Sequence, residues 1–254
     1  FQNPKLTVAK QQQRLDLSTK DSYMFKSWNA ENSPILPIFQ IEKNKNNTYK
    51  LWVHTNTIAE RLDLSNKKSL KIFFDRFESF PLIDKWQNYL SNEICSTAKF
   101  NTNEINDAIS LCIDINSENE IINWSFHLTR VKCSLLVEHQ HLEAILTRKK
   151  NARITSRILK PIKDYIEDIE KIIEISKEFR KKHLLNGKIE LPMSKNNIDS
   201  LQELLVHNPA DFSKEYLEPL NSNDIQTYLS PLLYEANSIW FNHSNNYGLN
   251  NASY

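Results

Sequence analysis

Glycine is scarce in this sequence, because only Gly187 and Gly248 occur among its 254 residues. Average proteins contain about 7 per cent glycine, and loops that cradle phosphates need it so that backbone N–H groups can approach the ligand closely. A Walker or Rossmann nucleotide site is therefore excluded. A serine nucleophile in a Gly-x-Ser-x-Gly turn is excluded for the same reason.

Cysteines are also few and far apart. Cys95, Cys112 and Cys133 have no Cys-x-x-Cys spacing, which argues against a disulfide framework or a zinc site and suits a reducing, intracellular compartment. No apolar run approaches the roughly 18 residues that a membrane span requires. We therefore expect no membrane span. The chain starts at Phe1 without a signal-peptide pattern, which leaves room for an N-terminus further upstream.

Charge of one sign is not in excess, since the net charge is +1. Without an overall basic field, any binding of nucleic acid has to come from a local patch. The chain is 40% apolar and 25% charged, which is ordinary for a soluble globular protein long enough to bury a sizeable core.

The sequence does contain two pairs of strand-like runs. ILPIFQI (35–41) and YKLWVH (49–54) are joined by an Asn/Lys-rich turn, and AISLCIDI (108–115) and IINWSFHLTRVK (121–132) by NSENE. Alternating apolar residues in the last run are typical of a half-buried strand in a hairpin. Pro34 and Pro37 lack ladder donors and make the first run a poor central strand.

Helical patterns cover 56–77 and most of the chain after residue 133. The clearest helix starts near Pro161 and ends before Gly187, with a buried stripe formed by Ile162, Ile166, Ile169 and Ile173. Another helix, at 225–241, is expected to be interrupted at Pro231. The prediction is an α+β fold, with β-hairpins in the N-terminal half packed against several helices from the C-terminal half.

Five short motifs, in order, resemble the RNB catalytic domain of the ribonuclease II/R family. They are RLDLST, WVHTNT, FPLIDKWQNYLSNEICS with the hairpin that follows it, NGKIELP after the long helix, and YEANSIWF. The resemblance implies a divergent RNB-like domain over 14–245, preceded by a polar lead-in (1–13) and followed by a polar tail (246–254).

The resemblance also implies a metal site that this sequence lacks. In the family, a carboxylate-rich segment after R-x-D-L-T holds the magnesium ions of a 3′-to-5′ exoribonuclease. The corresponding residues 29–38 are NAENSPILPI, and no aspartate occurs between Asp21 and Asp63. Neutral amides and apolar side chains do not offset a divalent cation. We therefore expect no metal, no cofactor and no catalytic residue in this chain.

Other family positions are only partly kept. The family's histidine corresponds to His54, but its neighbouring aspartate corresponds to Thr57. The two tyrosines that clamp RNA bases in the family correspond to Phe74, which could still stack on a base, and to Val137, which could not. The family's later segment with the catalytic arginine has no counterpart before Tyr254, which implies a shortened domain.

The stretch 147–160 is rich in basic residues. One interpretation is a surface that contacts RNA phosphates or an acidic partner, and the other is a solvated helix face. The basic residues are Arg148, Lys149, Lys150, Arg153, Arg157 and Lys160. His139 and His141 are two apart in a helical pattern, where their side chains diverge, so surface histidines are favoured over a metal site. The carboxylates between Asp164 and Glu178 have the spacing of a solvated helix face.

These observations favour a catalytically inactive, RNB-like pseudoenzyme that serves as an interaction or scaffold protein, with a protein partner in a larger assembly. The Asn/Lys/Ile-rich composition and the resemblance together indicate a plastid stroma or cyanobacterial cytoplasm, and a structural role in a photosynthetic assembly. One alternative is a non-cleaving RNA-binding protein that uses the basic stretch. The other is a divergent metal-dependent exoribonuclease with relocated ligands. The favoured hypothesis requires Ile35, Leu36 and Ile38 to pack against apolar neighbours.

Overall fold

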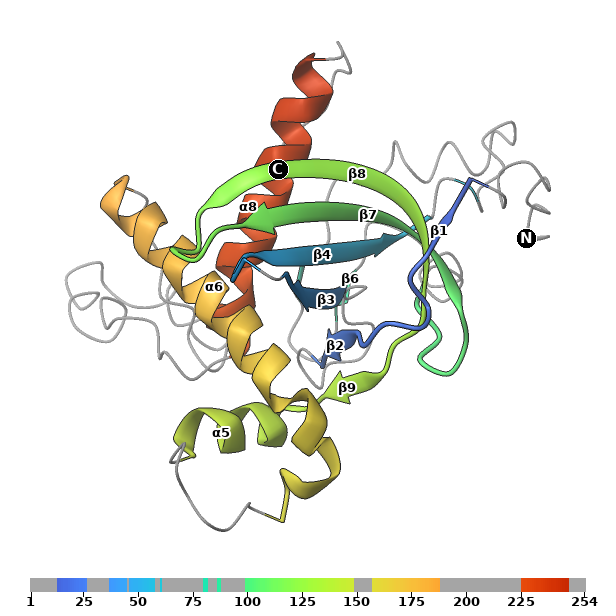
Figure 1. Cartoon of the computed structure of the whole chain (residues 1–254), viewed down its shortest axis with the longest axis vertical. Helices are drawn as coiled ribbons and strands as arrows, with labels where there is room; N and C mark the ends of the chain where they lie inside the picture. Colours follow the sequence, from blue (N-terminus) through green and yellow to red (C-terminus); the bar gives the residue numbers. More distant parts are fainter. Residues whose placement is uncertain are drawn as a thin grey trace.

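A computed structural model describes residues 13–26, 37–44, 46–57, 60, 80–81, 86–87, 99–148, 157–187 and 225–246. These residues form a seven-stranded mixed sheet of order β1-β8-β7-β4-β3-β2-β9, with helices packed on it (Figure 1). The strands of this sheet are Leu15–Asp16 (β1), Tyr23–Phe25 (β2), Ile38–Lys43 (β3), Tyr49–Asn56 (β4), Asn106–Ile115 (β7), Ile121–Val131 (β8) and Leu135–Val137 (β9). The remaining elements are the short pair Phe80–Pro81 (β5) and Trp86–Gln87 (β6), and the helices His139–Thr147 (α5), Lys160–Tyr165 (η1, a 3₁₀ turn), Ile166–Leu185 (α6) and Ile225–Asn246 (α8).

Both predicted hairpins are present. β3 pairs antiparallel with β4, and β7 with β8, while β4 and β7 join the two hairpins into one sheet. Asn47 and Asn119 in the two hairpin turns have positive φ angles of 56° and 59°. Glycine is the usual residue in this left-handed region, and asparagine is the side chain that tolerates it best.

The expectation that the first run makes a poor central strand is wrong. β3 lies inside the sheet, between β2 and β4. Its first paired residue is Ile38, opposite His54, so Pro37 stands just before the ladder and removes no hydrogen bond from it. Ile38 is fully buried beside Trp52, as the favoured hypothesis requires, whereas Ile35 and Leu36 lie outside the described residues.

The two faces of the sheet carry separate cores. On β4, Leu51 and Val53 face the helices and join one cluster with Ile169 and Leu232. The intervening Trp52 belongs to a second cluster on the opposite face, because successive side chains of a strand alternate between faces.

The long helix follows the predicted pattern. The four isoleucines at 162, 166, 169 and 173 are all buried, the first in η1 and the others in α6. Pro161 stands at the start of η1, where its missing N–H costs little. Gly187, with a φ of 81°, follows the last turn of α6 in the left-handed conformation that terminates many helices.

Two predictions after residue 133 need correction. α8 continues through Pro231 without an interruption, because its buried residues, among them Leu229 and Leu232, pack on both sides of the proline. Residues 135–137 form β9 rather than helix, since they pair in parallel with β2. The helix expected at 56–77 lies almost wholly outside the described residues. Among the helices that are described, none is long and apolar enough to cross a membrane.

Candidate functional site

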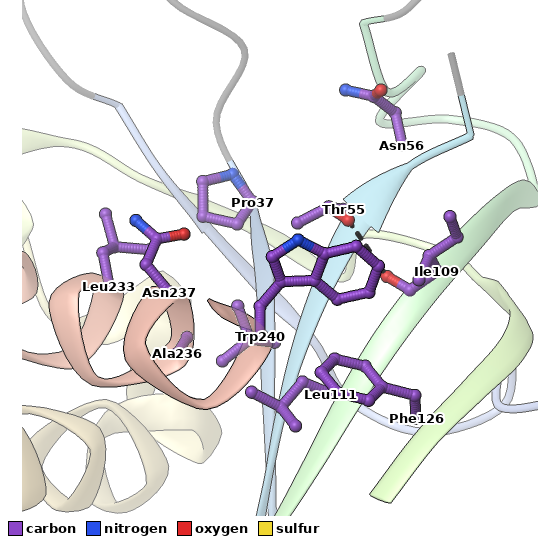
Figure 2. Close-up of a pocket in the computed structure, with 11 residues that line it drawn as sticks. Pro37, Thr55, Asn56, Ile109, Leu111, Phe126, Leu233, Ala236, Asn237 and Trp240 are labelled. Carbon is purple, nitrogen blue, oxygen red and sulfur yellow. Dashed lines mark hydrogen bonds between the residues drawn. The ribbon is translucent and has the colours of Figure 1, made fainter. Parts of the chain in front are cut away.

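A pocket of about 430 Å³ lies between α8 and one end of the central strands (Figure 2). Eleven residues line it: Pro37, Val53, Thr55, Asn56, Ile109, Leu111, Phe126, Leu233, Ala236, Asn237 and Trp240. Its volume is within the roughly 300–1,000 Å³ of ordinary ligand pockets.

The sheet register brings the floor of the pocket together. Val53 on β4 is paired with Leu111 on β7, which is paired with Phe126 on β8. One step along the ladder, Thr55 is paired with Ile109. All five side chains point to the face on which α8 packs, because alternate residues of a strand share a face.

Helix α8 supplies the opposite wall through four residues on one helical face, at positions 233, 236, 237 and 240. Figure 2 shows the Trp240 indole reaching from the helix over Leu111 and Phe126 towards Thr55 and Ile109. Trp240 is 44% exposed. Its ring centroid lies 5.2 Å from that of Phe126 at an interplanar angle of 86°, an edge-to-face arrangement that aromatic rings favour.

The aromatic wall continues past the pocket along β8. The His243 ring lies 5.0 Å from the ring of Phe126 and 5.2 Å from that of Trp124. Trp124 and Phe126 are themselves in edge contact at 5.7 Å. α8 thus contacts β8 beside the pocket through edge-to-face and tilted ring pairs.

The pocket is uncharged, because none of the described residues that line it is ionisable. Its polar groups are the Thr55 hydroxyl, which donates to the Ile109 carbonyl at 3.3 Å, and the amides of Asn56 and Asn237. Pro37, from the segment 29–38 that the sequence resemblance matches to the family's carboxylates, contributes a proline ring to this wall. Elsewhere in the described part of the chain, no group of three or more His, Cys, Asp and Glu side chains is placed to hold a metal ion.

The histidine that resembles the family's position lies on the other face of the sheet. His54 is fully buried, and its Nδ1 is 2.6 Å from the Ser110 hydroxyl, which is in turn 2.6 Å from the hydroxyl of Thr129. The Nε2 atom has no hydrogen-bond partner among the described residues. Burial lowers the pKa of His54 to about 3, so the ring is neutral near pH 7 and does not act as a cation. Thr57, which the sequence resemblance matches to the family's aspartate, is also buried.

Only some residues of the predicted basic surface are among those that the structure describes. Arg157 and Lys160 are exposed at the start of η1. Arg148 is bound to Glu170, with guanidinium-to-carboxylate distances of 2.9 and 3.0 Å, and this hydrogen bonding raises the pKa of Arg148 further. The other predicted residues, Lys149, Lys150, Arg153 and Phe74, lie outside the described residues.

Three further positions have ordinary structural roles. Val137 is buried in β9 and has no surface on which a base could stack. His141 lies in α5, where its Nδ1 accepts a hydrogen bond from the backbone N–H of Glu138 at 3.2 Å and caps the helix. Asp168 does not belong to the solvated face of α6, because it accepts a hydrogen bond of 2.6 Å from the hydroxyl of the buried Tyr23.

No pattern in the sequence marks Asn56, Asn237 or Trp240 as a site residue. Asn237 and Trp240 lie within YEANSIWF, which pointed to the family but not to a pocket. Their role depends on α8 lying across strands that are distant in sequence.

The sheet, its flanking helices and the order of the motifs define an α+β domain of a known kind. The RNB domain matches residues 14–251, so the chain belongs to the RNB family. A comparison with curated proteins finds no match.

Solved structures share this fold at low sequence identity. Yeast Ssd1, described as a pseudonuclease, has a TM-score of 0.55 at 14% identity over 72% of this chain. RNase R of Mycoplasma genitalium, in complex with ribose-methylated single-stranded RNA, has a TM-score of 0.58 at 9% identity over 76% of this chain. An active-site mutant of the Dss1 exoribonuclease of Candida glabrata has a TM-score of 0.56 at 13% identity over 70%. The matched regions cover 21%, 30% and 23% of those chains, respectively.

Proposed function

We propose that this chain is a non-catalytic RNB domain that binds a protein partner in a larger assembly. The observation that carries the proposal is the uncharged pocket beside Pro37, a residue of the segment 29–38 that the sequence resemblance leads us to match to the family's carboxylates. Hydrolysis of a phosphodiester through bound magnesium needs several negative oxygens that converge on the ion. A wall of proline, aliphatic and amide groups does not supply them.

The likeness to yeast Ssd1 supports the proposal, because that protein combines the same fold with the description of a pseudonuclease. A fold does not fix a function, and an RNB sheet without metal ligands still offers a shaped surface for recognition.

Incubation of the protein with end-labelled single-stranded RNA and Mg²⁺ or Mn²⁺ tests the loss of activity. We expect the RNA to stay at full length, while an active 3′-to-5′ exoribonuclease degrades it under the same conditions. Progressive shortening from the 3′ end that is lost in Glu31→Ala contradicts the proposal, because it implies metal ligands at other positions.

Copurification of the tagged protein from its source tests the partner. The composition and the family resemblance lead us to place the assembly in a plastid or cyanobacterial cell. A stoichiometric companion protein is the expected result. A protein that is recovered alone, or only with RNA, contradicts a scaffold role.

A second candidate function is RNA binding without cleavage. The exposed Arg157 and Lys160 favour it, and the fold is shared with an RNase R solved with single-stranded RNA. Binding through phosphate contacts weakens steeply as salt rises. If this candidate is correct, Arg157→Ala with Lys160→Ala should weaken binding, whereas Lys181→Ala on the exposed face of α6 should not. Absence of binding at low salt contradicts it.

A further inference from the structure

We propose that the pocket between α8 and the strand ends receives an uncharged aromatic or aliphatic side chain of a protein partner. This inference rests on the proposed function and specifies the chemistry by which the partner is recognised. The lack of charge in the pocket, its position relative to the basic residues and the nature of its polar groups support the inference.

The pocket lacks charged groups among its described lining residues. Its described lining combines proline, aliphatic and aromatic side chains with two amides and one hydroxyl. A charged group moved from water into such a site loses hydration without gaining an opposite charge, which is costly. An uncharged apolar side chain only removes its apolar surface from water when it enters the pocket. This burial is favourable by about 25 cal/mol per Å² of apolar surface.

The position of the pocket argues against a nucleotide. A base that entered it would bring a phosphate, which needs cations nearby. Of the predicted cationic residues, those described lie around α5 and η1, and η1 packs through Tyr165 against Tyr23 of β2, with ring centroids 5.8 Å apart. β2 and β9 are at one side of the sheet, whereas the Phe126 wall is on β8 at the other side (Figure 1). The aromatic wall of the pocket on β8 is therefore separated from β2 by β7, β4 and β3.

The polar groups suit a peptide. Asn237 is exposed and Asn56 is half-exposed, and both amides line the same pocket. An amide side chain offers both a donor and an acceptor, which is the pattern of a backbone peptide group. A partner that inserts one apolar side chain can thus pair its own backbone with these amides. The partly exposed Trp240 ring would cover the inserted group, in the manner of aromatic residues at interface hot spots.

Side-chain analogues test the pocket directly. The protein is labelled with 5-fluorotryptophan, and its Trp240 resonance is assigned with Trp240→Phe. We expect N-acetyl-L-tryptophanamide and N-acetyl-L-leucinamide to shift the Trp240 ¹⁹F resonance saturably. AMP and the charged N-acetyl-L-glutamic acid amide should leave it in place at the same concentrations.

A matched pair of variants locates the binding. Ala236→Trp places an indole inside the pocket and should abolish the shift. Asn242→Trp places the same indole at an exposed position of α8 outside the lining and should retain it. If Ala236→Trp does not fold, as judged by circular dichroism, Ala236→Leu fills part of the same space and should weaken the shift.

Two results overturn the inference. One is a Trp240 resonance that neither neutral analogue shifts, and the other is a shift by AMP at lower concentration than by N-acetyl-L-tryptophanamide. The latter result assigns the pocket to a nucleotide. RNA shortening in the nuclease assay refutes the proposed function, whereas failure of the neutral analogues without RNA shortening refutes the pocket inference alone.

Discussion

At the scale of single residues, His54 lies in the middle of the sheet with its imidazole ring removed from water. Among the described residues, the ring contacts the Ser110 hydroxyl and no carboxylate that would favour a proton. Desolvation therefore dominates and lowers the pKa of His54 to about 3.

This burial predicts a specific acid sensitivity. In the unfolded chain His54 takes up a proton near its ordinary pKa of about 6.5, whereas in the folded chain it does so only near 3. Because the unfolded state then binds more protons, the contribution of His54 to the free energy of unfolding falls by about 1.4 kcal/mol per pH unit below 6.5. Denaturant titrations of the wild type and His54→Gln from pH 7 to pH 5 should show curves that converge. Parallel curves would contradict the prediction.

The sequence predicted part of this residue-scale picture. His54 could be matched to the family through WVHTNT, but its neutrality could not be foreseen. That property depends on Ser110 and Thr129, which come from two other strands, and on the packing that excludes water.

At the scale of elements, Tyr23 and Asp168 connect β2 to α6. The tyrosine ring is fully buried, and its hydroxyl donates to a half-buried carboxylate. Burial is the main cause that raises the pKa of Asp168, followed by the neighbouring Asp21 and Glu167, while the hydrogen bond from Tyr23 opposes them. Because the pKa of Asp168 is higher in the folded chain than in the unfolded chain, protonation of Asp168 stabilises the fold at low pH. This stabilisation is lost as the pH rises through the folded-state pKa of Asp168.

Removal of the tyrosine hydroxyl should destabilise the fold. In Tyr23→Phe the Asp168 carboxylate loses its donor in a half-buried position, which costs about 1–3 kcal/mol. The free energy of unfolding from denaturant titration measures the loss. A double-mutant cycle with Asp168→Ala isolates the pair, and strictly additive effects would show that the two side chains are not coupled.

The predictability of the elements depends on how local their causes are. The isoleucine stripe of α6 follows the 3.6-residue period of a single segment, and the hairpins follow alternation with a turn between. β9 is three residues long and exists because β2, more than a hundred positions earlier, offers its edge. Proline normally interrupts a helix, but α8 continues through Pro231 because residues on both sides of it are packed in the core.

At the scale of the whole molecule, the uncharged pocket predicts how the protein responds to metal ions. Ligands that bind only the folded state raise the melting temperature. The described lining of the pocket has no carboxylate. We therefore expect millimolar Mg²⁺ or Mn²⁺ to change the melting temperature by no more than Ca²⁺ does at equal ionic strength. A saturable rise specific to Mg²⁺ or Mn²⁺ would contradict this.

The family and the fold class could be predicted from ordered motifs, and the RNB match over 14–251 confirms them. The pocket could not, because it forms where Trp240 and Asn237 on α8 meet Thr55 and Leu111 on strands that come much earlier in the chain. Periodicity indicates which face of a helix is apolar, but not which strands that face will cover.

The hairpin turns at Asn47 and Asn119 suggest an asymmetry in what a glycine-poor composition can maintain. Asparagine reaches left-handed backbone angles at modest strain, so both hairpins form without a glycine in these positions. Its side chain still projects from the backbone, so it cannot let a polyanion rest against bare peptide groups as glycine does. The scarcity of glycine therefore leaves these two turns intact, whereas a phosphate site built from main-chain N–H groups has no equivalent substitute.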